Sequence, residues 1–324
     1  MKKYLITGFA GFVGFHFIKH LSSVATEKIA VLGVDINYPF DFSISEFPKL
    51  ELSYKSINLL NYDDVRSVIV DFKPTHILHL ASLSSVGKSW QEPSNYFSNN
   101  TGIFLNIIEA VRETGIMCKI LNIGSSEEYG LVNDSQLPLK EEMSIIPANP
   151  YAVSKMAQEN LASVYRQGFG INIVSTRSFN HFGPRQRETF VVASFTKQIA
   201  QASNEGKKQL DMTTGNLNVI RDFLDVRDVV NAYYLLLEND NSKQIYNVCS
   251  GEGVSLIQMI NELSKISGIE IITHTDPGLV RPNDIPKIIG CNERLKNDVN
   301  WSRKIDLQQT LRDTFNYWKI QLSK

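Results

Sequence analysis

The sequence is poor in several features that would restrict its function. It has 3 cysteines in 324 residues, and Cys118, Cys249 and Cys291 have neither the number nor the spacing of a disulfide framework or a metal site. It has no apolar run of about 18 residues, which a membrane-spanning helix requires. Its 33 basic and 34 acidic residues leave a net charge of -1. We therefore expect a cytoplasmic protein that uses no metal and binds neither nucleic acid nor a membrane.

Hydrophobic residues make up 43% of the chain, which is enough for a large core. Over the first half, apolar runs typical of strands alternate with helical patterns, of which residues 61–72 (starting at Asn61 or Asp63) and 97–114 are examples. Strands are expected at residues 3–7, 29–35, 54–58, 75–81, 119–125 and 171–177. Near-continuous apolar strands separated by helices predict a Rossmann-like α/β fold, in which helices cover both faces of a doubly wound parallel sheet.

After about residue 180 the regular alternation loosens. Residues 226–239 and 254–267 have the pattern of amphipathic helices, and loops rich in proline and arginine precede and follow them. We expect two domains. Residues 1–178, with roughly 219–248 returning, would form a dinucleotide-binding domain, and residues 179–218 and 249–324 a smaller α/β substrate domain.

The N-terminus, "MKKYLITGFAGFVGFHF", resembles a signal peptide in its two lysines and its apolar stretch, but regularly spaced glycines interrupt that stretch. Gly8, Gly11 and Gly14 follow the first strand and open a helix. Glycines in such a turn let the backbone approach a pyrophosphate, and the helix N-terminus then faces the phosphates. Asp35 ends the second strand, where a carboxylate can bind the adenosine ribose and repel a 2′-phosphate. This pattern favours NAD(H), with NADP(H) as the second choice.

Tyr151 and Lys155 are four residues apart in "NPYAVSKMAQ", so both side chains lie on one face of a helix. An ammonium beside a phenol lowers the pKa of the tyrosine toward neutrality. The phenol can then exchange a proton with a carbonyl or alcohol oxygen while a nicotinamide exchanges hydride. Ser125, at the end of the fifth strand, is placed to hydrogen-bond the same oxygen.

Several motifs occur together in a fixed order along the chain: "TGFAGFVG", "HLAS", "SSEEYG", "NPYAVSK", "FNHFGP" and "RDFLDVRD". The sequence therefore resembles the extended short-chain dehydrogenases/reductases that act on nucleotide sugars, over essentially its whole length. The resemblance implies a nicotinamide cofactor and a nucleotide-sugar substrate. It also implies a homodimer through a four-helix bundle of residues 96–113 and 151–167, whose apolar candidates are Ile103, Ile107, Ala157 and Leu161.

The resemblance also assigns individual residues. It implies cofactor contacts at Gly8, Gly11, Phe12, Val13, Gly14, Asp35, Asn58, Leu59, Leu80, Ala81, Ser82, Asn99, Tyr151, Lys155, Phe179 and His181. It implies substrate contacts at Ser126, Glu127, Asn180, Arg185, Arg221, Arg281 and Asp284. The arginines suit the paired oxyanions of a nucleotide diphosphate. Asn58 departs from the family, which often has aspartate there.

Three reactions fit this pattern, namely 4-keto reduction, 4,6-dehydration and 4-epimerisation. Glu127 stands where a dehydratase has its acid/base, so it is a further catalytic candidate, while Glu128 is expected to be a solvated loop residue. The longer motifs, such as "ILNIGSSEEYG", most resemble GDP-4-keto-6-deoxy-D-mannose reductases. We therefore expect reduction of a GDP-4-keto-6-deoxy sugar, a hexose or a heptose. Dehydratase, epimerase and a non-catalytic dinucleotide-binding sensor stay as alternatives.

Overall fold

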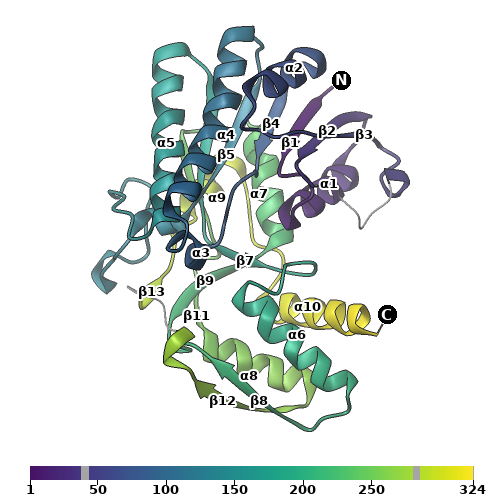
Figure 1. Cartoon of the computed structure of the whole chain (residues 1–324), viewed down its shortest axis with the longest axis vertical. Helices are drawn as coiled ribbons and strands as arrows, with labels where there is room; N and C mark the ends of the chain where they lie inside the picture. The colour runs from purple at the N-terminus through teal and green to yellow at the C-terminus, as the bar shows by residue number, and fades with distance from the viewer. Residues whose placement is uncertain (38–43, 280–284, 324) are drawn as a thin grey trace.

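A computed structural model describes residues 1–37, 44–279 and 285–323. Its main element is a seven-stranded sheet in the order β10-β6-β5-β4-β1-β2-β3, in which every neighbouring pair is parallel (Figure 1). The strands are β1 (Lys3–Thr7), β2 (Ile29–Asp35), β3 (Leu50–Ser56), β4 (His76–His79), β5 (Lys119–Ser125), β6 (Asn172–Ser178) and β10 (Ile245–Val248). The strand order reverses direction between β1 and β4. In open α/β sheets such a switch point, at the carboxyl ends of the strands, is where ligands bind.

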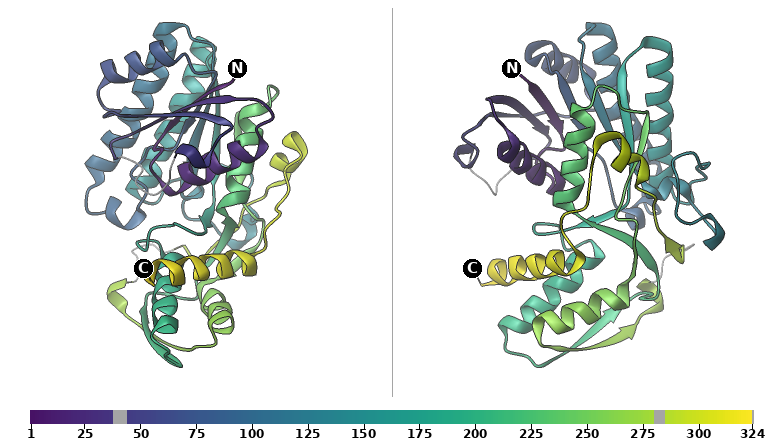
Figure 2. Two further views of the ribbon diagram at one scale, coloured as in Figure 1. Left: turned by 90° about the vertical axis from the view of Figure 1, so that its right-hand side faces the viewer. Right: turned by 180° about the vertical axis from the view of Figure 1, so that it is seen from behind.

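Helices cover both faces of this sheet because its strands are apolar on both sides. On one face Tyr4 and Ile6 pack with α1 (Phe12–Val24) and α7 (Val226–Glu238). On the other face Leu5 packs with α2 (Tyr62–Phe72), α4 (Pro93–Thr114) and α5 (Pro150–Phe169). The Rossmann-like α/β class is thus confirmed, and Figure 2 shows the three layers from two further sides.

A second lobe lies beyond the carboxyl ends of these strands (Figure 1). Its four-stranded sheet contains β7 (Asn180–Phe182), β9 (Ile220–Asp225), β11 (Gly253–Ser255) and β13 (Lys287–Ile288), and β8 (Gln209–Thr214) pairs with β12 (Glu270–Thr275). Helices α6 (Val191–Asn204), α8 (Leu256–Ser267) and α10 (Leu307–Leu322) share its hydrophobic core. The short helices α3 (Val86–Ser89) and α9 (Glu293–Val299) and four 3₁₀ turns complete the elements of the described chain.

Most element positions agree with the sequence, and two strands differ. The third strand begins at Leu50 rather than Tyr54, and the fourth covers only His76–His79. Polar residues alternate with apolar ones at the start of β3, an edge strand that is half exposed, so this strand lacks the continuous apolar run that marks the others. Of the returning segment, α7 and β10 join the first lobe, whereas β9 belongs to the second sheet. The division into two domains stays a prediction.

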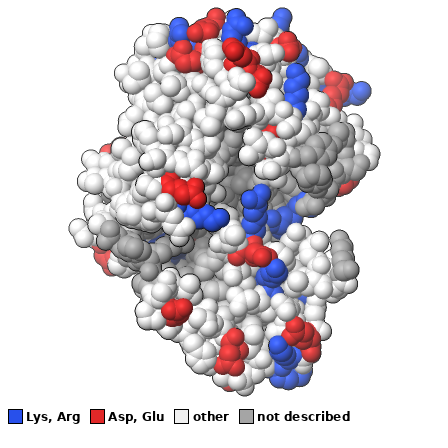
Figure 3. Space-filling view, viewed as in Figure 1, with Lys and Arg blue, Asp and Glu red and all other residues white. Residues whose placement is uncertain are grey.

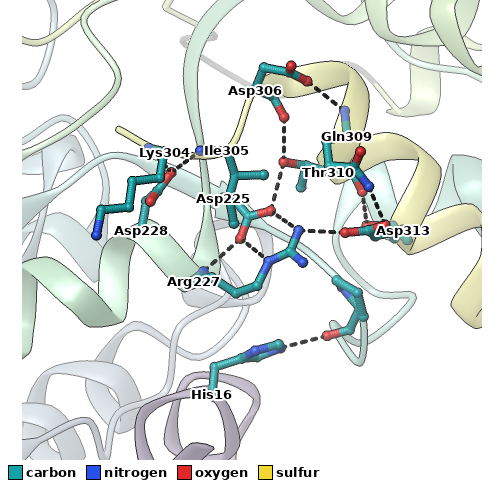
Figure 4. Close-up of polar contacts among 12 residues, drawn as sticks. His16, Asp225, Arg227, Asp228, Lys304, Ile305, Asp306, Gln309, Thr310 and Asp313 are labelled. Carbon is teal, nitrogen blue, oxygen red and sulfur yellow. Dashed lines mark hydrogen bonds and ion pairs between the residues drawn. The ribbon is translucent and has the colours of Figure 1, made fainter. Parts of the chain in front are cut away.

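A buried carboxylate joins the two lobes at the start of α7 (Figure 4). Asp225 caps this helix by accepting a hydrogen bond from the backbone N–H of Arg227, and it also binds the guanidinium of that residue at 2.9 and 2.7 Å. Thr310 of α10 donates to the same carboxylate at 2.8 Å, and Asp313 pairs with Arg227 at 2.7 Å. The C-terminal helix is therefore fixed to the strand that leads back into the first lobe. No described helix is both long enough and apolar enough to cross a bilayer.

Candidate active site

The glycine turn lies against the end of β4. Gly8 has φ 68°, and a Cβ atom there would lie 2.7 Å from the backbone N of Ala81, so only glycine fits. A Cβ on Gly14 would lie 2.4 Å from the carbonyl oxygen of Phe9. Helix α1 begins at Phe12, and no side chain caps its first N–H groups. The turn therefore offers the close backbone approach and the free helix N-terminus that a pyrophosphate requires.

Asp35 lies beside this turn. Its carboxylate accepts hydrogen bonds from the backbone N–H groups of Ala10, at 3.1 Å, and Asn37, at 3.0 Å. The half-buried acid at the end of β2 is thus held within reach of a ligand on the turn. The arrangement fits a dinucleotide whose adenosine ribose meets Asp35.

The proton-transfer pair lies on α5, beside the end of β5. Asn149 caps this helix by accepting a hydrogen bond from Ala152 N at 2.9 Å, and Pro150 occupies its first turn. This fixes Tyr151 at the start of the helix, where it is buried and its hydroxyl lies close enough to the Ser125 side chain for that side chain to oppose the rise of the phenol's pKa. The structure therefore brings together the predicted Ser125 and Tyr151.

Lys155 is one turn further along α5 but points elsewhere. Its ammonium donates to the carbonyl oxygen of Ile123 at 2.8 Å and to Gln158 at 3.2 Å, and it lies 6.0 Å from the centre of the Tyr151 ring. Burial lowers the pKa of Lys155 to about 8. The expectation that the pKa of Tyr151 is brought toward neutrality is wrong for the protein alone, in which that pKa is raised. Desolvation raises that pKa, and the carboxylates of Glu128 and Glu127 raise it further.

The two carboxylates of "GSSEEYG" differ sharply. Glu127 is half-buried and accepts a hydrogen bond from Asn149, the cap of the catalytic helix, at 2.8 Å. Glu128 was expected to be solvated, but it is 0% exposed. Its side chain folds back onto the backbone N–H of Ser125, because residues 126–129 form a 3₁₀ turn whose capping box uses Glu128.

The other predicted cofactor residues fall into two groups. Leu80, Ala81 and Ser82 follow β4 and are half-buried beside the glycine turn, as are Phe12 and Val13 on the turn itself. The side chains of Leu59 and Phe179 instead pack in hydrophobic cores, so only their backbone atoms are available to a ligand. Asn58 is exposed, and its side chain closes a local turn by accepting from Leu60 N at 3.0 Å.

Asn100, the neighbour of the predicted cofactor residue Asn99, organises this part of the site. Asn100 is fully buried, accepts from Leu83 N at 2.8 Å and donates to Ser154 of α5 at 2.9 Å. It therefore connects the loop after β4 to the catalytic helix, whereas Asn99 donates only to Asn100, at 3.3 Å. The single signal in the sequence was the "NN" pair itself, which does not say which amide turns inward.

The molecule is hollowed between the lobes, and cationic side chains gather there (Figure 3). The ring of His181 is stacked parallel to Phe12 of α1, with their centres 6.4 Å apart, so β7 meets the glycine turn. Arg185 places its guanidinium 3.9 Å from the centre of the Phe15 ring. Arg221 and Asn180 are half-buried on β9 and β7, and Ser126 is buried beside Ser125. Arg281 and Asp284 lie outside the described residues.

The sequence matches the family model described as GDP-mannose 4,6 dehydratase over residues 5–314. The chain belongs to this family. Its members are extended short-chain dehydrogenases/reductases that act on nucleotide sugars. A GDP-6-deoxy-D-mannose reductase of Pseudomonas aeruginosa is 31% identical to it, over 99% of this chain and 98% of that enzyme.

Two solved structures of this family resemble the fold. The structure of RMD from Pseudomonas aeruginosa complexed with NADPH has a TM-score of 0.84 and 30% identity, and covers 99% of this chain and 100% of that one. The Thermus thermophilus UDP-glucose 4-epimerase in complex with NAD has a TM-score of 0.82 and 28% identity, and covers 98% and 99%. Because reductase, epimerase and dehydratase all occur among these proteins, family membership leaves the reaction open.

Proposed function

We propose that this protein reduces the 4-keto group of a GDP-4-keto-6-deoxy sugar with hydride from NAD(P)H. The observation that supports it is the buried, neighbouring pair of Ser125 and Tyr151, in a chain that matches a GDP-6-deoxy-D-mannose reductase along its whole length. Gly8, Gly11 and Gly14 would hold the pyrophosphate and Asp35 the ribose. The nicotinamide, when bound, supplies hydride. The product would be a GDP-6-deoxy sugar used to build polysaccharide.

The protein's own residues move the proton. Reduction adds hydride to C4 and leaves negative charge on the C4 oxygen, which takes the proton of the Tyr151 hydroxyl. Ser125, which lies beside the phenol, would hydrogen-bond the same oxygen and so hold it next to the proton donor. The phenolate left behind recovers its proton from solvent, and the buried Lys155 ammonium favours that phenolate over a longer distance than the sequence implied.

The direct test is stoichiometric cofactor oxidation. Purified protein supplied with GDP-4-keto-6-deoxy-D-mannose is expected to oxidise one NADH or NADPH per sugar, followed by the loss of nicotinamide absorbance. GDP-mannose without added reductant is the control and should stay unchanged. Mass spectrometry that showed loss of water from GDP-mannose would replace the proposal with a dehydratase, in which Glu127, bound to Asn149, acts on the sugar.

Asp35 is expected to set the cofactor preference. Removal of its carboxylate in Asp35→Ala takes away the ribose acceptor and the repulsion of a 2′-phosphate, so the ratio of kcat/KM for NADH over NADPH should fall about tenfold. Asp35→Asn keeps an acceptor without the charge and separates the two effects. An unchanged ratio in both variants would show that Asp35 does not contact the ribose.

We also propose a homodimer through α4 and α5. Two of the residues predicted for this interface, Ile103 and Ile107, are instead buried in the protomer's own core. The same two helices expose Phe97, Leu105 and Val164, with 46%, 37% and 60% of their surfaces accessible. Sedimentation is expected to give a dimer for the wild type and a monomer for Leu105→Glu/Val164→Glu. A wild-type monomer would remove this proposal.

A further inference from the structure

Glu128 is a buried carboxyl group for which the proposed reaction has no use. It is 0% exposed and lies in the 3₁₀ turn that carries Ser125 and Glu127. One oxygen, Oε1, accepts a hydrogen bond from the backbone N–H of Ser125 at 2.6 Å. The backbone of Gly124 makes room for it, since a Cβ atom there would lie 2.5 Å from Oε1 and 2.4 Å from the carbonyl oxygen of Thr176. The carboxyl group is thus built into the end of β5.

The second oxygen of this carboxyl group, Oε2, is buried and has no hydrogen-bond partner. Two cations lie nearby, but both are engaged with other acceptors. Arg177 of β6 makes a two-point ion pair with Glu159, at 2.8 and 2.9 Å, and Lys155 donates to Ile123 and Gln158. No ion pair reaches Glu128 within the described residues.

An unpaired buried carboxylate is far more costly than a neutral carboxylic acid. The charged and titratable groups that act on Glu128 are Glu159, Arg177 and Lys155, and Glu128 in turn acts on Tyr151. Burial first, and then the Glu159 carboxylate, raise the pKa of Glu128 to about 8 against the opposing effect of the two cations. A carboxylate here would add negative charge that acts on Tyr151, the proposed proton donor, and disfavours its phenolate.

We propose that Glu128 is a positioning residue that keeps its proton at neutral pH, fixes Ser125 through the backbone, and adds no negative charge to that of Glu127 beside the Ser125–Tyr151 pair. The neutral acid satisfies the Ser125 N–H just as a carboxylate would. It does so without opposing the transfer of the Tyr151 proton to the substrate oxygen.

The protonation state can be measured without substrate. Between the usual glutamate pKa of 4.5 and about 8, the folded chain binds a proton that the unfolded chain has lost, so wild-type stability falls as pH rises through this window. Glu128→Gln removes this titration. The Tm of the variant minus the Tm of the wild type is therefore expected to increase by about 5 °C between pH 5 and pH 8. Glu127→Gln, one residue away and half-buried, is the matched control for the loss of a carboxyl group from this turn. A Tm difference for Glu128→Gln that does not change with pH would overturn the proposal.

The positioning role rests on the proposed reductase activity and is read from kcat. Glu128→Gln keeps an oxygen that accepts from Ser125 N and should retain kcat within about threefold, whereas Glu128→Leu loses the acceptor and should lose about tenfold with KM unchanged. Equal kcat in both variants would refute positioning. If the wild type itself does not reduce the keto sugar, the proposed reaction fails and the thermal comparison still decides the charge of Glu128.

Discussion

Tyr151→Phe is expected to lower kcat for reduction by at least about 100-fold, since removal of a general acid commonly costs 10²–10⁴-fold. The phenol is the one proton donor that the structure places against Ser125 on the catalytic helix. The ring itself stays, so its packing at the start of α5 is kept. The dissociation constant for NADH or NADPH should change little, because the glycine turn and Asp35 are untouched.

The control for this variant is another buried phenol far from the glycine turn. Tyr246 is fully buried on β10, and its hydroxyl donates to Asp298 at 2.9 Å. The hydroxyl also accepts from Lys243 N at 2.7 Å, so Tyr246→Phe removes two hydrogen bonds and should cost about 2 kcal/mol of stability while kcat is retained. Turnover of Tyr151→Phe near the wild-type rate would refute the assignment of Tyr151 as the proton donor.

The sequence predicted the parts of the site that depend on periodicity and on spacing. Gly8 after a strand, Asp35 at the end of the next and Tyr151 four residues before Lys155 each have one placement in a Rossmann-like fold, and the structure has them there. The direction of a side chain within a tight turn is different, because it depends on contacts with distant strands. Glu128 shows this, since its burial depends on Gly124.

The same limit explains the tyrosine pKa. The four-residue spacing correctly put Tyr151 and Lys155 on one face of α5, but it could not show that Ile123 and Gln158 take the ammonium. Nor could it show the full burial of the phenol, whose desolvation exceeds the effect of any nearby charge. Charge effects between side chains follow from distances and solvent exposure, which a linear pattern does not contain.

Glu159→Ala is expected to destabilise the protein by about 3–5 kcal/mol at neutral pH, measured by urea denaturation. Glu159 lies one turn after Lys155 on α5, and its carboxylate holds both Nε and Nη2 of Arg177 on β6. Both side chains are nearly inaccessible to solvent, at 8% and 4%. Without Glu159 the guanidinium keeps its hydrogen bond to the carbonyl oxygen of Glu141, at 3.2 Å, and its contact with the Tyr129 ring. A buried cation would then lack its counter-charge.

The double variant Glu159→Leu/Arg177→Met separates the lost ion pair from the lost packing. Apolar side chains of similar volume remove both charges, so this variant should be much closer in stability to the wild type than Glu159→Ala. The exposed pair of Lys265 and Glu262 is a matched control, and Lys265→Ala should change stability by less than about 0.5 kcal/mol. A loss below about 1 kcal/mol for Glu159→Ala would show that Arg177 finds another partner. Glu128 is the carboxyl group that would then be available to Arg177. The Glu159–Arg177 ion pair therefore also keeps the Arg177 charge away from Glu128, the residue that positions Ser125.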